Sequence, residues 1–410
     1  MPSGVESNPA PGARQAAYAL RARTRYLTPS QRERGCGCWS VLKDDEGSDP
    51  YVEVRREHGI ARARWCGLLQ CGHIWTCPVC SLQKRAKRAQ LFDAALRGLG
   101  GRWQMLTVTL RHREGMPLAV LLSGLMKAWR RCRQGGRVQA IWTRNVSASA
   151  RATEIPYGDN GWHVHLHVVL RTPEWSGEER RTLLEAFQNA IRTELGPACV
   201  PSDLRALHWS DSFDGRDESK RGEYISKCGL ELAGFGKARK YHADGTPAGL
   251  TSWQLAERAV EGDQKALRLW SEYYAATKGR RAFELDERAA AAGKAQLLDD
   301  AFAAAEGRDE YGVDSEAIPE DPPVRVQVKT RDFWALRGAE RHTPSILAFV
   351  LRDIELEGSA SLARWLAYAR SRDPCRSSSP PPTSSNSMPQ SSQSLTPSTL
   401  QSCSAWPKAS

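Results

Sequence analysis

The sequence predicts an α+β fold in which an antiparallel sheet is flanked by helices. Short segments with alternating apolar residues indicate strands, and longer segments with apolar residues at helical spacing lie between them. Two strand-like segments are joined by Gly158-Asp159-Asn160-Gly161, a composition typical of the tight turn in an antiparallel hairpin. Together these patterns favour a hairpin-based sheet over a parallel one.

The elements follow in order from residue 103. Residues 103–110 predict a buried strand, because Thr and Val alternate with apolar residues after two glycines. A helix should open at Pro117, since proline is favoured in a first helical turn. Further strands are expected at 138–146 and 204–209, a hairpin at 151–170, and helices at 178–195, 223–232, 255–277, 289–305 and, as a pair, within 343–370.

The composition narrows the class of partner. Lys and Arg total 58 against 47 acidic residues, and the net charge of +11 favours a polyanion such as nucleic acid. No apolar run approaches the roughly 18 residues of a membrane helix, and the first 15 residues lack the apolar core of a signal peptide. The eleven cysteines therefore indicate metal ligands or buried thiols rather than disulfides.

Six of these cysteines lie close together in the first 80 residues. Cys77-Pro78-Val79-Cys80 places two thiolates at a spacing typical of a structural Zn²⁺ site. We favour Cys71 as the third ligand and one of Cys36 and Cys38 as the fourth. Cys66 and His73 remain alternatives, and a set of reduced thiols without metal is the competing interpretation. Next along the chain, Lys84, Arg85, Lys87 and Arg88 predict a basic helical face that contacts phosphates.

Three histidines alternate with apolar residues in the segment Gly161 to Leu170. On a strand, His163, His165 and His167 would share one face. Glu154 would join them across the hairpin, opposite His165 if the turn is Asp159-Asn160, and opposite His167 if the turn is one residue later. Two imidazoles and a carboxylate suit Mn²⁺ or Mg²⁺, with Mn²⁺ the better match to nitrogen. The competing interpretation is a solvated histidine face on an edge strand.

The segment GWHVHLHVVL closely resembles the His-hydrophobic-His signature of the HUH endonucleases, in the form found in rolling-circle plasmid replication initiators, the Rep proteins. The resemblance implies that His165 and His167 bind the catalytic metal and that His163 matches a third histidine of this subgroup. Residues 106–110, LTVTL, resemble the family's first motif, a strand beside the active site. The implied fold is an HUH-type antiparallel sheet flanked by helices.

The family's third motif, Tyr-x-x-Lys, is matched by Tyr224 and Lys227. Positions three apart are neighbours on a helix, so the resemblance implies Tyr224 as nucleophile and Lys227 as a phosphate contact. A phenol is a weak nucleophile unless it is activated. Some relatives carry a glutamate four residues before the tyrosine, whereas this chain has Lys220, so Glu218 and Glu223 both remain candidate bases. Tyr273 and Tyr274 are rival tyrosines, and the nearby Lys278, Arg280 and Arg281 resemble a DNA-contacting part of actinobacterial Rep proteins.

The resemblance implies a bacterial cytoplasmic enzyme that binds a plasmid double-strand origin and nicks one strand. The expected products are a 5′-phosphotyrosine and a free 3′-OH, with later rejoining of the strand. No P-loop is present, so a host helicase and a host DNA polymerase are the implied partners, with no membrane. Alternatives are a histidine-triad nucleotide hydrolase or transferase, a relaxase or transposase of the HUH superfamily, and a non-catalytic zinc-dependent DNA-binding protein.

These motifs divide the chain into expected regions. The HUH catalytic domain would cover residues 100–235. It would be preceded by a flexible basic arm at 1–30 and a zinc-binding, basic helical module at 31–99. It would be followed by a helical region at 236–372 for DNA or host contacts and by a disordered Ser/Pro-rich tail at 373–410.

Overall fold

The computed structural model describes residues 12–38, 49–57, 60–227, 249–306 and 323–372. The predicted tail at 373–410 and the last five residues of the helix predicted at 223–232 lie outside these residues. None of the helices in the described parts of the chain is long and apolar enough to cross a bilayer.

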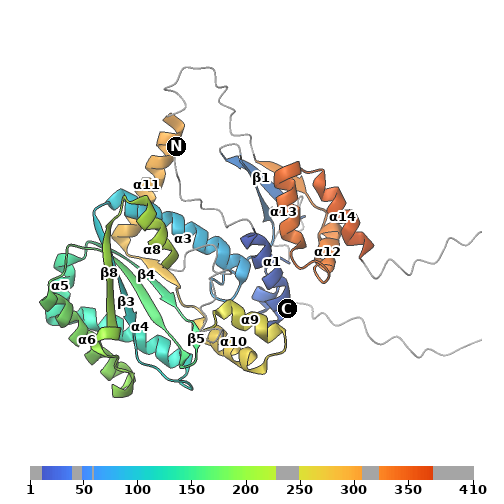
Figure 1. The fold of residues 1–410 in the computed structure, drawn as a ribbon. Coiled ribbons are helices and arrows are strands. Elements are labelled where there is room, and N and C mark those ends of the chain that lie inside the picture. Colours follow the sequence, from blue (N-terminus) through green and yellow to red (C-terminus); the bar gives the residue numbers. More distant parts are fainter. Residues whose placement is uncertain (1–11, 39–48, 58–59, 228–248, 307–322, 373–410) are drawn as a thin grey trace, which may run out of the picture. The chain divides into compact units, whose positions relative to one another are not determined.

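A five-stranded antiparallel sheet forms the centre of the fold (Figure 1), with strand order β8-β3-β7-β4-β9. The predicted α+β class with an antiparallel sheet is confirmed, and the strand predicted at 103–110 is β3. The bounds are β3 (Arg102–Thr109), β4 (Ala148–Glu154), β7 (His165–Arg171), β8 (Leu207–Asp214) and β9 (Phe283–Leu285).

The two faces of this sheet bury different side chains, because successive residues on a strand point to opposite sides. Leu106 and Leu166 belong to the core beneath helices α4 and α6, whereas Met105 and Val169 belong to the core beneath α3, α8 and α11. His165 and His167 have the parity of Val169 and therefore lie on the second face. The helix bounds are α3 (Pro78–Leu99), α4 (Leu118–Gln134), α6 (Gly177–Leu195), α8 (Glu218–Lys227) and α11 (Glu287–Glu306).

The hairpin has the first of the two registers considered from the sequence. Glu154 lies directly opposite His165 in the β4–β7 pair. Short strands β5 (Tyr157–Gly158) and β6 (Gly161–Trp162) extend it, so the turn is Asp159-Asn160. Gly161 has a φ of 81°, and a Cβ there would meet the Glu114 backbone at 3.1 Å. Only glycine fits this position without strain.

The strand predicted at 138–146 is wrong: residues 138–145 belong to helix α5 (Gly136–Asn145), and Val146 follows its end. Val138, Ile141 and Asn145 are its buried residues, and their spacing of three and four places them on one helical face. The β-branched and aromatic residues suggested a strand, but packing of this face beside α4 and α6 decides the outcome.

Two other predicted elements differ in extent, and several short elements were not predicted. The helix predicted at 255–277 is two helices, because Gly262 (φ 98°) breaks it and Asp263 caps the second through a hydrogen bond to the Ala266 N–H. The strand predicted at 204–209 begins only at Leu207, after a helical turn. The further bounds are η1 (Arg25–Leu27), α2 (Gln31–Arg34), η2 (Pro197–Cys199), α7 (Asp203–Ala206), α9 (Ser252–Val260) and α10 (Gln264–Thr277).

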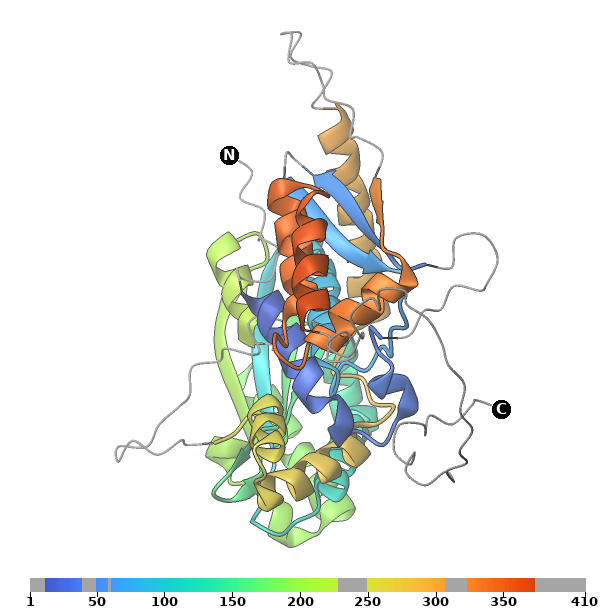
Figure 2. The ribbon, with the colours of Figure 1, turned by 90° about the vertical axis from the view of Figure 1, so that its right-hand side faces the viewer.

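A second, three-stranded sheet joins the two ends of the described chain. Its order is β10-β1-β2, and Tyr51 of β1 pairs with Gln327 of β10. The C-terminal helices pack against these strands and against α1 (Figure 2), and the Trp65 indole N–H donates to the Leu347 carbonyl at 3.0 Å. The bounds are α1 (Ala13–Thr24), β1 (Tyr51–Glu57), β2 (Ile60–Cys66), β10 (Val324–Gln327), α12 (Thr330–Ala339), α13 (Ile346–Glu357) and α14 (Ser361–Ser371).

This sheet links segments that were expected to be separate. Residues from the regions 31–99 and 236–372 share one hydrophobic core. Within the expected basic arm, residues 13–24 form helix α1, because Tyr18 and Leu20 are buried. The third sheet of the described residues consists of two strands, β5 and β6 of the hairpin.

Candidate metal centres

Glu154, His165 and His167 form a compact group on the second face of the central sheet. Their ligand atoms all lie within 4.8 Å of one another. The Nε2 atoms of His165 and His167 lie 2.9 and 3.5 Å from the same carboxylate oxygen, Oε2 of Glu154. The hairpin register produces this convergence, because Glu154 and His165 are direct cross-strand neighbours.

The Nδ1 atoms of the two imidazoles, on the ring side away from Glu154, have different surroundings. His167 Nδ1 lies 3.2 Å from the hydroxyl of Thr107, its register partner on β3. His165 Nδ1 is buried and has no hydrogen-bond partner among the described residues. Both rings therefore direct Nε2 at the carboxylate, and the group of two nitrogens and one oxygen could hold a divalent metal ion.

His163 lies beside this group but not in it. Its ring centroid is 4.9 Å from that of His165, and its Nδ1 is 2.8 Å from Nε2 of His112. Burial, followed by the charges of His165 and His112, lowers the pKa of His163 to about 4. The ring is therefore neutral near pH 7, as a metal ligand must be.

A cavity of about 690 Å³ opens beside these histidines. Its lining includes Thr109, His112 and His163, together with Arg111 and Arg205. Both arginines are exposed, and neither forms an ion pair with another residue that the structure describes. The two arginines thus give the cavity positive charge. The cavity lies next to the group of Glu154, His165 and His167, here called the metal group.

Tyr224 lies on the same face of the sheet as the metal group. Its hydroxyl donates to the Asp211 carbonyl at 2.7 Å and lies 2.8 Å from the Ser210 hydroxyl, and its ring stacks on Phe213. His208 of β8 lies level with His167, two strands away, and Ser210 is two residues further along β8. The backbones of Ser210 and His167 are therefore about 12 Å apart. The side chain is 3% exposed. Tyr224 therefore shares a sheet face with the metal group, but its hydroxyl is hydrogen-bonded to β8.

The other residues predicted around Tyr224 are less closely placed. Lys227 ends α8, and its side chain lies outside the described residues. Glu223 and Glu218 are exposed, and Glu223 pairs with Lys220 at 3.2 Å. The rival tyrosines Tyr273 and Tyr274 are buried in α10, where burial raises the pKa of Tyr273 to about 12.

Helix α3 carries basic residues past the metal group. Lys84 and Lys87 are exposed, whereas Arg88 donates to the Phe283 carbonyl at 2.7 Å. Arg85 Nε donates to the Ser81 hydroxyl at 3.0 Å. Burial lowers the pKa of Arg85, and the charges of Tyr273 and Glu154 oppose this shift. Of the second predicted basic group, Lys278 and Arg281 are exposed, and Arg280 donates to the Ser123 hydroxyl and the Ala276 carbonyl.

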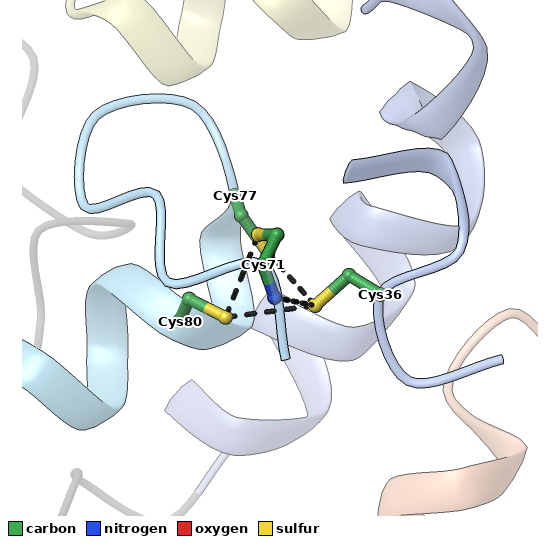
Figure 3. A group of neighbouring side chains, drawn as sticks. All are labelled: Cys36, Cys71, Cys77 and Cys80. Carbon is green, nitrogen blue, oxygen red and sulfur yellow. Dashed lines mark hydrogen bonds between the residues drawn. The ribbon is translucent and has the colours of Figure 1, made fainter. Parts of the chain in front are cut away.

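A second group consists of Cys36, Cys71, Cys77 and Cys80 (Figure 3), all of them buried. The sulfur atoms of Cys36 and Cys80 are 3.5 Å apart, and the Cys36–Cys77 and Cys71–Cys80 distances are both 3.7 Å. Four sulfurs at about 2.3 Å from a tetrahedral Zn²⁺ would be about 3.8 Å apart. The spacing therefore fits a tetrathiolate metal site.

Cys38 and Cys66, the other candidates, are not in this group. The Cys38 thiol contacts Arg25 and lies 2.8 Å from an Arg337 nitrogen. Cys66 ends β2 and is half-buried. Cys36 is thus the fourth member, because the chain turns between Cys36 and Cys38 at Gly37, which has a φ of 65°.

Arg21 of α1 is a buried cation beside the thiol group. Its side chain is buried, and its Nε and Nη2 atoms have no hydrogen-bond partner among the described residues. Its guanidinium carbon lies 4.6 Å from the centre of the Tyr18 ring, and the charges of Tyr18, Cys36 and Cys77 raise its pKa against the effect of burial. An isolated buried cation is costly, whereas four thiolates around one divalent ion carry a net charge of −2. Arg21 therefore fits a metal-loaded, negatively charged cysteine group.

Comparison with known proteins gives a partial match. The chain is 28% identical over 288 residues to "Protein rep" from Streptomyces lividans, a match that covers 53% of this chain and 62% of that protein. It is 30% identical over 149 residues to "Neomycin resistance protein" from Streptomyces cyanogenus, covering 28% and 34% of the two chains. The chain thus spans less than two thirds of either relative. No family model and no solved structure matches it. The first similarity supports a Rep-type protein.

Proposed function

We propose that the protein initiates plasmid rolling-circle replication by nicking one strand of origin DNA. The observation that carries this proposal is the convergence of Glu154, His165 and His167 on the sheet face that also carries Tyr224. The similarity to "Protein rep" supports the coarser part of this proposal, a plasmid replication protein. Host helicase and DNA polymerase would then act on the nicked product.

The metal group would position the scissile phosphate. His165, His167 and Glu154 would hold Mn²⁺ or Mg²⁺, which, when bound, would supply Lewis acidity to a phosphate oxygen. The Tyr224 oxygen would form a bond to phosphorus as the bond from phosphorus to the 3′-oxygen breaks. A carboxylate, Glu223 or Glu218, would accept the phenolic proton, and the leaving 3′-oxygen would take up a proton to become a 3′-OH. The 5′-phosphate would remain on Tyr224.

This reaction requires Tyr224 to leave its present position. Its hydroxyl is bound to Asp211 and Ser210, about two strands from His167. Binding of the DNA strand would have to supply the free energy to exchange these contacts for contacts at the phosphate, each neutral hydrogen bond being worth about 1 kcal/mol. Lys227, three residues further along α8, would follow Tyr224 and hold the flanking phosphate.

Basic residues around the site would bind the DNA backbone. Positive charge is available from Arg111 and Arg205 in the cavity and from the exposed Lys84, Lys87, Lys278 and Arg281. Such contacts give affinity without reading the sequence. The cysteine group would hold Zn²⁺ as a structural site that fixes the start of α3 relative to the metal group.

The test uses the purified full-length protein with single-stranded DNA from a candidate origin, in Mn²⁺ or in EDTA. We expect a covalent adduct in Mn²⁺ that mass spectrometry maps to Tyr224. Tyr224→Phe should abolish the adduct, and Tyr274→Phe, a matched change at the rival buried tyrosine, should not. An adduct that persists in Tyr224→Phe would refute the assigned nucleophile. Hydrolysis of a nucleoside phosphoramidate in EDTA, with no adduct, would instead indicate a histidine-triad enzyme.

A further inference from the structure

His112 lies just beyond the end of β3 and connects the hairpin turn to the histidine strand. Its Nδ1 atom is 2.9 Å from the Asn160 carbonyl oxygen, and its Nε2 atom is 2.8 Å from Nδ1 of His163. The ring centroids of His112 and His163 are 5.0 Å apart, and those of His163 and His165 are 4.9 Å apart. A continuous line of contacts therefore runs from Asn160 through His112 and His163 to the metal group.

The carbonyl at one end of this line determines where the protons are. A carbonyl oxygen can only accept, so Nδ1 of His112 must donate to Asn160. In neutral His112, Nε2 then carries a lone pair and accepts a hydrogen bond. His163 must therefore donate from Nδ1, which leaves the lone pair of His163 on Nε2. Metal-binding histidines commonly have this arrangement, in which the nitrogen that does not bind the metal donates to an acceptor.

We propose that His112 is a positioning residue that holds His163 in the Nδ1–H form and so prepares Nε2 of His163 to join the metal group as a further ligand. The proposal rests on the proposed function only in that the group binds a divalent ion. Without an ion, His163 lies outside the three residues whose ligand atoms are within 4.8 Å of one another. Its ring would turn toward the ion on binding while keeping the hydrogen bond to His112.

The test measures Mn²⁺ affinity by electron paramagnetic resonance at pH 8, where free imidazole is neutral. The full-length, zinc-containing protein is compared with His112→Phe, His112→Gln and His208→Phe. Loss of an outer-shell partner typically weakens metal binding by about 10- to 100-fold, and we expect His112→Phe to fall in this range. His112→Gln should bind nearly as wild type, because its amide oxygen can still accept from His163. His208→Phe is the matched control, since His208 is exposed on β8 outside the line of contacts.

A second measurement reads the tautomer directly in the folded wild-type protein. Nitrogen-15 NMR should show protonated Nδ1 and unprotonated Nε2 on His163, and this pattern should be lost in His112→Phe. Unchanged Mn²⁺ affinity in His112→Phe, or a protonated Nε2 on His163 in the wild type, would overturn the proposal. Failure of the wild type to form a DNA adduct while Mn²⁺ binding depends on His112 would refute the proposed function and leave this inference standing.

Discussion

The cysteine group and the Glu154–His165–His167 group differ in how completely the protein surrounds the place for an ion. The four cysteines are all buried, and their sulfur spacing already satisfies a tetrahedral ion. The second group offers three ligand atoms, two of its members are half-buried, and a cavity lies beside it. A saturated, closed site can stabilise a fold, whereas an open position is needed for a substrate. The difference in enclosure therefore supports the proposal that the cysteine group is structural and that the Glu154–His165–His167 group is catalytic.

The largest expected effect comes from removing one ligand of the cysteine group, the closed site. Cys80→Ser removes one of four thiolates, and structural Zn²⁺ in zinc-finger peptides contributes roughly 10–16 kcal/mol, comparable with the whole stability of a domain. We expect loss of bound zinc and unfolding of the module formed by α1, β1, β2 and the C-terminal helices. Metal analysis and thermal unfolding with and without chelator measure this. Cys66→Ser, at a half-buried cysteine outside the group, should retain zinc; zinc loss there would reassign the ligands.

The next effect comes from the cation beside the closed site. Arg21→Leu leaves the negative charge of the loaded cysteine group uncompensated, and breaking a buried pair typically costs about 3–5 kcal/mol. We expect a lower unfolding free energy and faster transfer of zinc to a colorimetric chelator. Arg23→Leu is the control on the same helix, because its pair with Glu261 is solvent-exposed and worth about 0–1 kcal/mol. Equal effects of the two changes would contradict the proposed charge compensation.

Breaking the open site should change metal binding and leave the fold almost unaffected. Glu154→Gln keeps the shape of the side chain but removes the charge that attracts the ion. We expect loss of tight Mn²⁺ binding, with a change in unfolding free energy of about 1 kcal/mol or less, since the amide oxygen of Gln can still accept hydrogen bonds from His165 and His167. Calorimetric Mn²⁺ titration and chemical denaturation measure the two quantities. A protein that unfolds when Glu154 is changed would show that this site is structural as well.

The smallest effect provides a reference that involves no metal. Glu179 completes the capping box of α6, and its hydrogen bonds to the Ser176 N–H and the Asn145 amide lower its pKa from 4.5 to about 2. A depressed carboxyl pKa stabilises the folded state above pH 4.5, and this stability is lost as the pH falls through 2. Glu179→Gln should therefore cost about 1 kcal/mol at pH 7, and the deficit should shrink between pH 4.5 and 2. Denaturation at several pH values, with and without chelator, should show no metal dependence of this deficit.

The sequence predicted the hairpin but left two turn positions open, and either register placed Glu154 on the histidine face. The break at Gly262 and the Asp263 cap within the helix predicted at 255–277 were missed, although both residue types are signals for a helix boundary. The prediction failed at residues 138–146, because packing of one helical face overrode local strand propensity. The choice between Cys36 and Cys38 could not be made from spacing, since it depends on how the segment at 36–38 meets the loop at 71. His112 carried no signal as an isolated histidine, and its role emerges only from its position beside His163.

Pairing of β1 with β10 has a consequence for synthesis of the protein. Tyr51 meets Gln327, so the sheet that supports the cysteine group closes only after most of the chain has left the ribosome. The central sheet, from β3 to β9, is translated completely before β10. Contacts between residues so far apart in sequence form slowly. Strand edges that remain unpaired until then promote aggregation. Early zinc binding by the four cysteines, all within the first 80 residues, would hold the N-terminal segment in order until its partner strand arrives.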